Sequence, residues 1–284
     1  MKEAEEFLKD IKLSKSENTF LTYQVSIRKF VEFLKEKNLR LKDVKPSHIR
    51  EFRNSLAEKF QPSTVNNRLS AIREFFEFLL ERGDVESNPV SHRLYLKQKK
   101  RLPKPLTIQE LKTVLNACER SDYRLCLFSM ASLGTRVSET VNLKKGDFIF
   151  NRYLKVKVLG KGNKERITIS CFEAYDKEIK EYLDKLEGER VFPFSVSAIK
   201  KYCITLSKKT GIKVSCHRLR HTYATILVKE GMDIIRVKEL LGHSDVSTTA
   251  IYTEISLSDI EKRMVRIRNQ YIKPKLTIQR VRLK

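Results

Sequence analysis

A basic segment closed by two prolines, residues 97–105, divides the chain into two stretches with different hydrophobic patterns. Five of its nine residues are lysine or arginine, and Pro103 and Pro105 prevent it from continuing a helix. This composition is typical of an exposed, semi-extended connector. We therefore expect two domains and two connecting or terminal segments: residues 1–95 and 106–272, a linker at 96–105 and a basic tail at 273–284.

The first stretch, residues 1–95, shows only helical periodicity. Apolar residues recur at three- and four-residue steps in runs that begin near Phe20, Pro46 and Ser63, and a shorter amphipathic segment precedes them. These runs predict about four helices. We expect Ser47 to cap the helix that opens at Pro46.

The second stretch combines helical runs with one region of strict alternation. Thr107 and Glu110 have the spacing of a capping box at the start of its first helix. Alternating residues on both sides of the sequence 160–163 predict a β-hairpin with a glycine-rich turn. Later helices are predicted at 172–186, 196–209, 217–229, 234–241, 245–252 and 256–267. The chain as a whole is thus expected to be mainly α with a small antiparallel β-hairpin or sheet.

Positive charge dominates the composition. The chain has 58 Lys and Arg against 35 Asp and Glu, a formal net charge of +23, while 40% of its residues are apolar. The excess charge therefore belongs to a folded protein, whose natural partner is nucleic acid. No window approaches the roughly 18 consecutive apolar residues of a spanning helix, and the first residues lack a signal peptide's apolar core. We expect a cytoplasmic, nucleoid-associated protein with no membrane partner.

The five cysteines do not form a recognisable framework. They are scattered, odd in number and free of any Cys-x-x-Cys pair, which favours reduced and mostly buried thiols. Cys216 directly precedes His217, but a nucleophile and its base normally meet in space and not in sequence. We therefore favour a structural role for Cys216.

The stretch from His217 to Tyr252 concentrates residues that suit work on a phosphate ester. It holds three of the five histidines, several arginines and a phenol. Metal binding by His217 and His221, one helical turn apart, is disfavoured because Arg218 and Arg220 would repel a cation. Phosphate fits the same residues, since arginine forks bind its oxygens bidentately.

Two earlier residues offer further cations. Arg136 follows an apolar helix that ends at Gly134, and either Glu139 or a bound phosphate is a suitable partner for it. Lys161 lies in the hairpin turn, where a solvated lysine is the ordinary alternative to a functional one. A P-loop is excluded because no Gly-x-x-x-x-Gly-Lys-Ser/Thr sequence exists. Tyr252 is the candidate nucleophile, since nearby cations would stabilise its phenolate.

Taken in order, these residues resemble the tyrosine recombinase (phage integrase) family, and within it the Xer-type recombinases. The matching segments are 135–139, 158–164, 217–221 and 240–243, followed by Tyr252. The likeness extends to the layout, which implies an N-terminal four-helix core-binding (SAM-like) domain, a basic linker and a C-terminal α+β catalytic domain. Position 135 departs from the pattern, because the family more often has leucine or methionine where this chain has threonine.

The resemblance implies a site-specific DNA recombinase that works without cofactor, metal or ATP. Tyr252 would attack a DNA phosphodiester to form a 3′-phosphotyrosyl bond, and Lys161 would protonate the leaving 5′-hydroxyl. The remaining implied site residues hold the phosphate: Arg136, His217, Arg220 and His243. The implied outcome is strand exchange between double-stranded recombination sites through a Holliday junction, in the service of chromosome-dimer resolution. The implied assembly is a homotetramer on two DNA sites and a monomer or dimer off DNA.

Three other functions remain open on sequence grounds. A type IB topoisomerase would use nearly the same chemistry to relax DNA, and a phage or plasmid integrase would use it for integration. A DNA-binding protein with an inactive site is the third. The presence of all six expected site residue types disfavours this last alternative.

Overall fold

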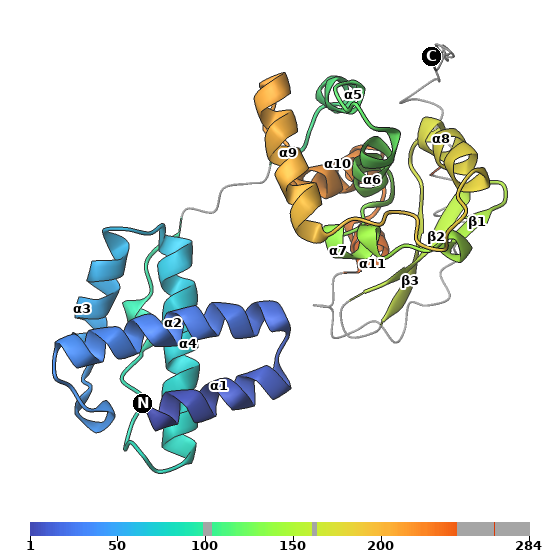
Figure 1. The fold of residues 1–284 in the computed structure, drawn as a ribbon. Helices are drawn as coiled ribbons and strands as arrows, with labels where there is room; N and C mark the ends of the chain where they lie inside the picture. Colours follow the sequence, from blue (N-terminus) through green and yellow to red (C-terminus); the bar gives the residue numbers. More distant parts are fainter. Residues whose placement is uncertain (99–103, 161–163, 243–263, 265–284) are drawn as a thin grey trace, which may run out of the picture. The chain divides into compact units, whose positions relative to one another are not determined.

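The computed structural model divides into two compact units, Met1–Arg101 and Leu102–Lys284 (Figure 1). The residues that it describes are 1–98, 104–160, 164–242 and 264. Each unit buries its own hydrophobic core. The prediction of a mainly helical protein with one small antiparallel sheet is confirmed.

Four α-helices form the N-terminal unit, as the periodicity predicts. They are α1 (Lys2–Ser14), α2 (Glu17–Glu36), α3 (Pro46–Ala57) and α4 (Pro62–Glu81), with the short 3₁₀ segments η1 (Leu41–Asp43) and η2 (His92–Leu94). Aromatic rings fill much of their shared core. Phe30 makes edge contacts with Phe52 and Phe76 at centroid distances of 5.3 and 5.9 Å. Such contacts add to the burial energy and fix the helices against one another.

The expected cap at Ser47 is wrong. Helix α3 already includes Ser47, because it begins at Pro46, and its N-cap residue is Lys45, two residues before the expected cap. Proline suits the first helical position because its φ is already helical and the N–H that it lacks has no partner there. The imidazole Nδ1 of His48 accepts from the backbone N–H of Lys45 at 3.1 Å, so a histidine supplies the capping acceptor.

The C-terminal unit combines helices with a three-stranded sheet. Its elements are α5 (Ile108–Asn116), α6 (Ser121–Leu133), α7 (Val137–Val141), η3 (Lys145–Asp147), β1 (Phe148–Phe150), β2 (Leu154–Leu159), β3 (Glu165–Ile169), α8 (Glu173–Asp184), α9 (Val196–Thr210), α10 (Cys216–Lys229) and α11 (Ile234–Leu241). The predicted hairpin is β2–β3, and β1 adds a third antiparallel strand beside β2. The helices expected at 245–252 and 256–267 lie outside the described residues, apart from Met264, which is helical and buried.

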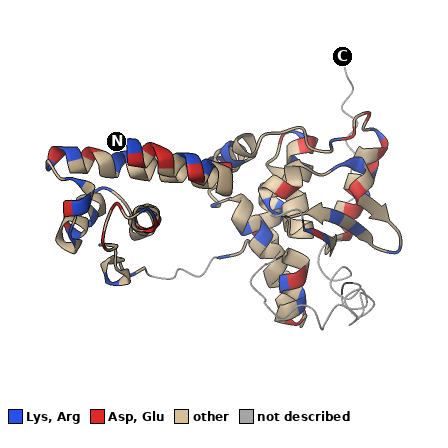
Figure 2. Ribbon diagram, turned by 90° about the horizontal axis from the view of Figure 1, so that it is seen from below, with Lys and Arg blue, Asp and Glu red and all other residues tan. Residues whose placement is uncertain are grey.

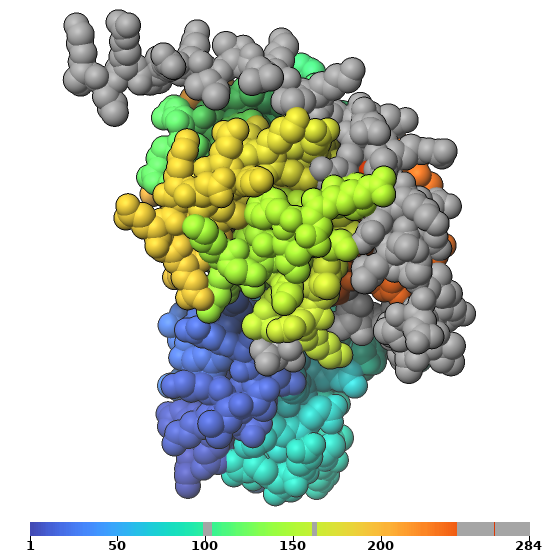
Figure 3. Space-filling view, turned by 90° about the vertical axis from the view of Figure 1, so that its right-hand side faces the viewer, coloured from blue at the N-terminus to red at the C-terminus, as the bar shows by residue number. Residues whose placement is uncertain are grey.

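Helix α6 organises the C-terminal unit. Its residues from Leu125 to Leu133 are all buried, because it packs against α10, α8, α5 and β3. The strands and α8 lie next to one another on one face of this unit (Figures 1 and 3). Every side of α6 is covered between Leu125 and Leu133, so the next charged side chain along the chain can appear only after the helix ends.

Basic residues are spread along the helices of both units, with acidic residues interspersed among them (Figure 2). In the part of the chain that the structure describes, no helix is both long and apolar enough to cross a bilayer.

Candidate active site

Arg136 lies in the turn between α6 and α7. Gly134 makes this turn in the left-handed conformation, with φ +66°, and a Cβ there would stand 2.3 Å from Cδ1 of the buried Tyr223. Arg136 then becomes the N-cap residue of α7. Its backbone N–H donates to Glu139 Oε2 at 2.7 Å, and its Nη1 donates to Glu139 Oε1 at 2.8 Å. The partner that the sequence left undecided is thus Glu139 in this structure, yet 40% of the Arg136 side chain stays exposed.

Arg220 reaches the same place from α10 but is buried. Its Nη1 donates to the carbonyl oxygen of Gly134 at 2.8 Å and its Nη2 to that of Leu241 at 2.7 Å. Nη1 also lies 3.7 Å from Glu139 Oε2. Burial, with the nearby charge of Arg136 adding to it, lowers the pKa of Arg220 to about 10. Arg220 therefore keeps its positive charge at neutral pH.

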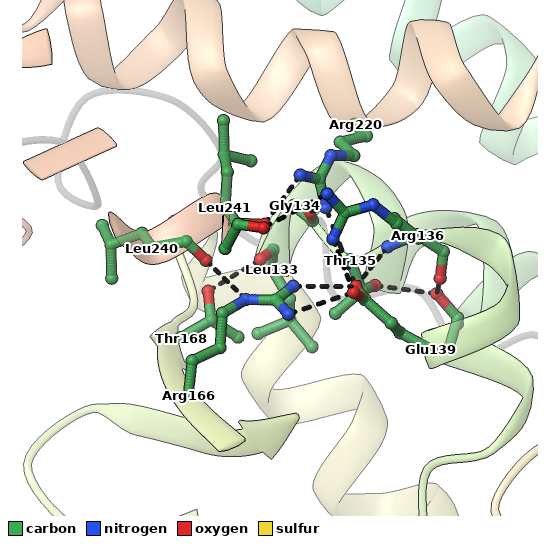
Figure 4. Close-up of polar contacts among 12 residues, drawn as sticks. Leu133, Gly134, Thr135, Arg136, Glu139, Arg166, Thr168, Arg220, Leu240 and Leu241 are labelled. Carbon is green, nitrogen blue, oxygen red and sulfur yellow. Dashed lines mark hydrogen bonds and ion pairs between the residues drawn. The ribbon is translucent and has the colours of Figure 1, made fainter. Parts of the chain in front are cut away.

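Glu139 is the common acceptor of this cluster (Figure 4). Besides Arg136, it binds Arg166 of β3, whose Nη1 and Nη2 donate to Oε1 at 3.1 Å and to Oε2 at 2.7 Å. Burial alone raises the pKa of Glu139, but hydrogen bonds from Arg166 and from the Arg136 backbone outweigh it, and the net pKa is lowered. A buried carboxylate thus stays ionised among three arginines.

The C-terminal end of α11 completes the cluster. Helix ends leave carbonyl groups without helical partners, and here each of three successive carbonyls accepts from a different arginine. Leu240 accepts from Arg166 Nε at 2.9 Å, Leu241 from Arg220 as described, and Gly242 from Arg136 Nη2 at 3.2 Å. The negative end of the helix dipole favours these cations. The three guanidinium groups are therefore fixed at the helix end that directly precedes His243 in the sequence.

His217 and His221 interact in the first turns of α10. Their Nε2 atoms lie 2.8 Å apart, so one ring donates to the other, and the rings meet edge to face at a centroid distance of 4.2 Å. His217 is exposed and stands three residues before Arg220, which places both on neighbouring positions of one helix face. Within the described ranges, no cluster of three or more His, Cys, Asp and Glu side chains is arranged to hold a metal ion.

Arg218 and Cys216, neighbours of His217, have structural contacts. The guanidinium of Arg218 donates to the backbone carbonyls of Lys104, at 2.6 Å, and of Pro105, at 3.2 Å. Cys216 Sγ lies 3.8 Å from Cys203 Sγ on α9, and the hydrogen bond from Cys203 lowers the pKa of the Cys216 thiol. Arg218 thus anchors the start of the C-terminal unit, and Cys216 joins two helices.

The structure brings together part of the site predicted from sequence. Arg136 and Arg220 meet around Glu139, and His217 shares a helix with Arg220. Lys161, His243 and Tyr252 lie outside the described residues. Arg166 was missed, because nothing in its local sequence separates it from other hairpin arginines; only the contact with α7 and α11 distinguishes it.

Comparisons with known proteins cover nearly the whole chain. Residues 104–258 match the phage integrase family, and residues 4–83 match the phage integrase N-terminal SAM-like domain. Tyrosine recombinase XerC of Leptospira interrogans is 31% identical over 91% of this chain and 90% of its own length. Tyrosine recombinase XerD of Rickettsia bellii is 29% identical over 88% and 92%, respectively. A crystal structure of a lambda integrase dimer bound to a COC′ core site has the same fold, with a TM-score of 0.72, 19% identity and coverage of 90% of this chain and 98% of that one.

Proposed function

The chain belongs to the phage integrase family of tyrosine recombinases, and from this premise we propose that it cuts and rejoins DNA at specific sites through a 3′-phosphotyrosyl bond to Tyr252. The observation that carries the proposal is the pair formed by Arg136 and Arg220. Two guanidinium groups from distant helices share one buried carboxylate and one helix end, which is an arrangement built to hold an anion in a fixed place.

Arg136 and Arg220 have different tasks in this proposal. Arg136 is partly exposed and can fork onto a non-bridging phosphate oxygen, whereas Arg220 is buried and supplies a fixed positive field next to it. In the transition state the phosphoryl oxygens carry increased negative charge, and preorganised donors stabilise it without reorganisation. His217 and His243 add further donors to the same oxygens.

Tyr252 and Lys161 perform the covalent step. The Tyr252 oxygen attacks phosphorus as its proton passes to water, the P–O bond to the 5′-oxygen breaks, and Lys161 donates a proton to that oxygen. The phosphotyrosyl ester conserves the energy of the broken ester, so rejoining needs no ATP. A 5′-hydroxyl of the partner strand then attacks the phosphotyrosine and releases Tyr252. Because the cations of the chain provide the charge stabilisation, the proposal includes neither a metal nor another cofactor.

Double-stranded DNA is the partner that this chemistry requires, and a net charge of +23 suits it. Exchange between two sites breaks four strands, two at a time, so we propose four protomers on two sites, with monomers or dimers off DNA. The XerC and XerD relatives support a role in resolving chromosome dimers, which would require the chain to work beside the nucleoid in the cytoplasm.

Adduct formation tests the nucleophile. Duplexes are first selected from a random-sequence library by binding, then nicked at successive positions so that a cleaved fragment diffuses away. Incubation in EDTA should give a detergent-stable protein–DNA adduct with the wild-type chain and none with Tyr252→Phe. Tyr182→Phe, which loses only the hydrogen bond to the Val191 carbonyl, should form the adduct normally.

Three results would count against the proposal. An adduct with Tyr252→Phe would exclude this nucleophile, and inhibition by EDTA would exclude the metal-free step. A chain that relaxes supercoiled plasmids but never exchanges strands between two selected sites would be a topoisomerase instead of a recombinase.

The role of Lys161 has its own test. Replacing the 5′-bridging oxygen by sulfur gives a leaving thiolate, whose conjugate acid has a pKa of about 8.5 and which departs without a proton. Lys161→Ala should therefore cleave ordinary DNA slowly and the sulfur-bridged DNA at the wild-type rate. Equal defects on both substrates would show that Lys161 acts in another way.

A further inference from the structure

Arg166 is held more completely than either arginine of the proposed site. All three of its donor groups have acceptors: Nη1 and Nη2 fork onto the two oxygens of Glu139, and Nε donates to the Leu240 carbonyl (Figure 4). Its side chain is 11% exposed. A guanidinium that is held at all three nitrogens and is only 11% exposed is poorly placed to bind DNA, so we expect its effect on the reaction to pass through its partners.

Arg166 and Arg136 bind Glu139 in different ways. Arg166 forms a bidentate pair with both carboxylate oxygens, whereas the Arg136 side chain donates one hydrogen bond to Oε1 and another to the Gly242 carbonyl. A guanidinium in a bidentate pair with a carboxylate cannot present the same fork to a phosphate. By occupying Glu139, Arg166 leaves part of the Arg136 fork available.

The Arg166 side chain lies next to two glycines. A Cβ at Gly242, where φ is +65°, would stand only 2.9 Å from Cδ of Arg166 and would clash, whereas a Cβ at Gly160 would make an ordinary contact of 3.5 Å with its Nη1. One glycine ends α11 and the other directly follows β2. The Arg166 side chain therefore passes through the junction of the hairpin with the end of α11.

We propose that Arg166 is a positioning residue for DNA cleavage. It binds Glu139 as a structural counterion, ties β3 to the end of α11, and so keeps Arg136 available to the phosphodiester. This inference rests on the proposed function, because it assumes that Arg136 binds the scissile phosphate. It differs from a purely structural role in one respect: the decrease in the rate of adduct formation on losing Arg166 should depend on the charge of Glu139.

The test compares Arg166→Met, Glu139→Gln and the double variant. Single-turnover adduct formation is measured at saturating protein on the nicked duplexes, and DNA affinity is measured separately. Arg166→Met should slow adduct formation about tenfold or more while affinity changes less than about twofold, because a transition-state contact is affected. In the double variant, the neutral amide at position 139 cannot form a bidentate ion pair with Arg136. Adduct formation should therefore be roughly several-fold faster than with Arg166→Met alone, which is the non-additivity expected of two residues in contact.

Two further variants sharpen the result. Arg166→Lys keeps the charge but can reach fewer of the three acceptors, so its rate should fall between wild type and Arg166→Met. Arg124→Met removes another arginine–carboxylate fork, the one that joins α6 to Glu178 of α8. Arg124→Met should lower thermal stability and leave the adduct rate of the folded protein unchanged. It is therefore the control for losing a bidentate arginine–carboxylate pair outside the site.

The outcomes are separable. A folded Arg166→Met chain that forms adduct at the wild-type rate would overturn the inference, as would a double variant no faster than Arg166→Met. Absence of a Tyr252-dependent adduct from the wild-type chain would instead overturn the proposed function. Circular dichroism and thermal melts of every variant show whether a slow chain is folded.

Discussion

The Nη2 atom of Arg220 donates to the carbonyl oxygen of Leu241 at 2.7 Å, which joins α10 to the last turn of α11. The same side chain donates to the Gly134 carbonyl at 2.8 Å. Arg220 thus connects three segments that are distant in sequence. Its charge is buried with two other guanidinium groups nearby, an arrangement that stability alone does not favour.

Arg220→Met should separate stability from activity. The pKa of Arg220 is about 10 when folded, against an ordinary 12.5, so the unfolded chain binds its proton more tightly. Holding the charge at neutral pH therefore costs about 3 kcal/mol, and stability should rise with pH between these two values. The variant removes that cost but leaves two carbonyls without a donor, at about 1–3 kcal/mol each.

The two effects of Arg220→Met on the unfolding free energy oppose each other, so the unfolding free energy measured in urea should change by no more than about 3 kcal/mol. Adduct formation should fall on the order of 100-fold through loss of transition-state stabilisation. Arg190→Met, which removes a donor to the Val141 carbonyl at the end of α7 and not a contact of the arginine cluster, is the matched control and should leave the rate unchanged. A normal rate with Arg220→Met would contradict the proposed role.

Gly134→Ala should disturb the turn that delivers Arg136. A Cβ at Gly134 meets the Tyr223 ring at 2.3 Å and Leu241 Cδ2 at 2.9 Å, and both neighbours are buried. Overpacking of this kind costs about 1–3 kcal/mol, in addition to about 1 kcal/mol for an alanine in the left-handed region. The unfolding free energy should fall by the sum, and the displaced α11 end should slow adduct formation.

Gly211→Ala is the control for the backbone part of that cost. Gly211 ends α9 with φ +71°, and a Cβ at this position would meet no packed neighbour within 4 Å. Only the conformational cost of about 1 kcal/mol should appear. Equal losses of unfolding free energy for the two variants in urea would show that Tyr223 and Leu241 move aside for the added Cβ without an energetic penalty.

Much of this fold follows from periodicity. The residues of α11, 234–241, are those that the apolar pattern predicts, because both ends carry clear signals: Asp233 caps the start and Gly242 adopts the left-handed conformation at the end. Strand β1 was not separated from its surroundings, since three residues are too few to establish alternation.

The site could be predicted only in part, for a physical reason. Residue types and their order pointed to Arg136 and Arg220, but the choice between Glu139 and phosphate depended on distances. Backbone carbonyls have no residue signature, so the acceptors at the end of α11 could not be found by sequence reasoning. Arg166 was missed because its role comes from those acceptors and from Glu139.

Glu139→Gln should weaken the fold in a pH-dependent way. The pKa of Glu139 is lowered below 4.5 because hydrogen bonds from Arg166 and the Arg136 backbone outweigh the effect of burial. A lowered carboxyl pKa contributes stability that is complete above the unfolded value and is lost as pH falls through the folded value. At pH 7 the variant leaves three arginines without their counterion, which should cost about 3–5 kcal/mol.

Urea unfolding of Glu139→Gln and wild type from pH 7 to pH 3 measures this effect. The difference in unfolding free energy should shrink below pH 4.5, where the wild-type carboxylate itself becomes protonated in the unfolded chain and then in the folded one. A difference that stays constant over this range would mean that the charge of Glu139 does not stabilise the cluster.

His221→Ala should act on DNA cleavage through His217. The hydrogen bond between their Nε2 atoms fixes the orientation and tautomer of the His217 ring, and a donor held in place needs less reorganisation than a free one. His221→Ala should therefore slow adduct formation about three- to tenfold, whereas His217→Ala removes the donor itself and should cost on the order of 100-fold. The double variant should be no slower than His217→Ala, since His221 then has nothing to orient.

Single-turnover rates at saturating protein distinguish this coupling from two independent contributions. Independent effects would multiply, so a double variant about three- to tenfold slower than His217→Ala, as additivity requires, would show that His221 acts by another route. His92→Ala in the N-terminal unit is the control for loss of an imidazole, because His92 contacts Arg73 and Tyr95 far from this cluster in sequence. Its adduct rate should match wild type once the protein is saturating, since the chemical step depends on the C-terminal unit.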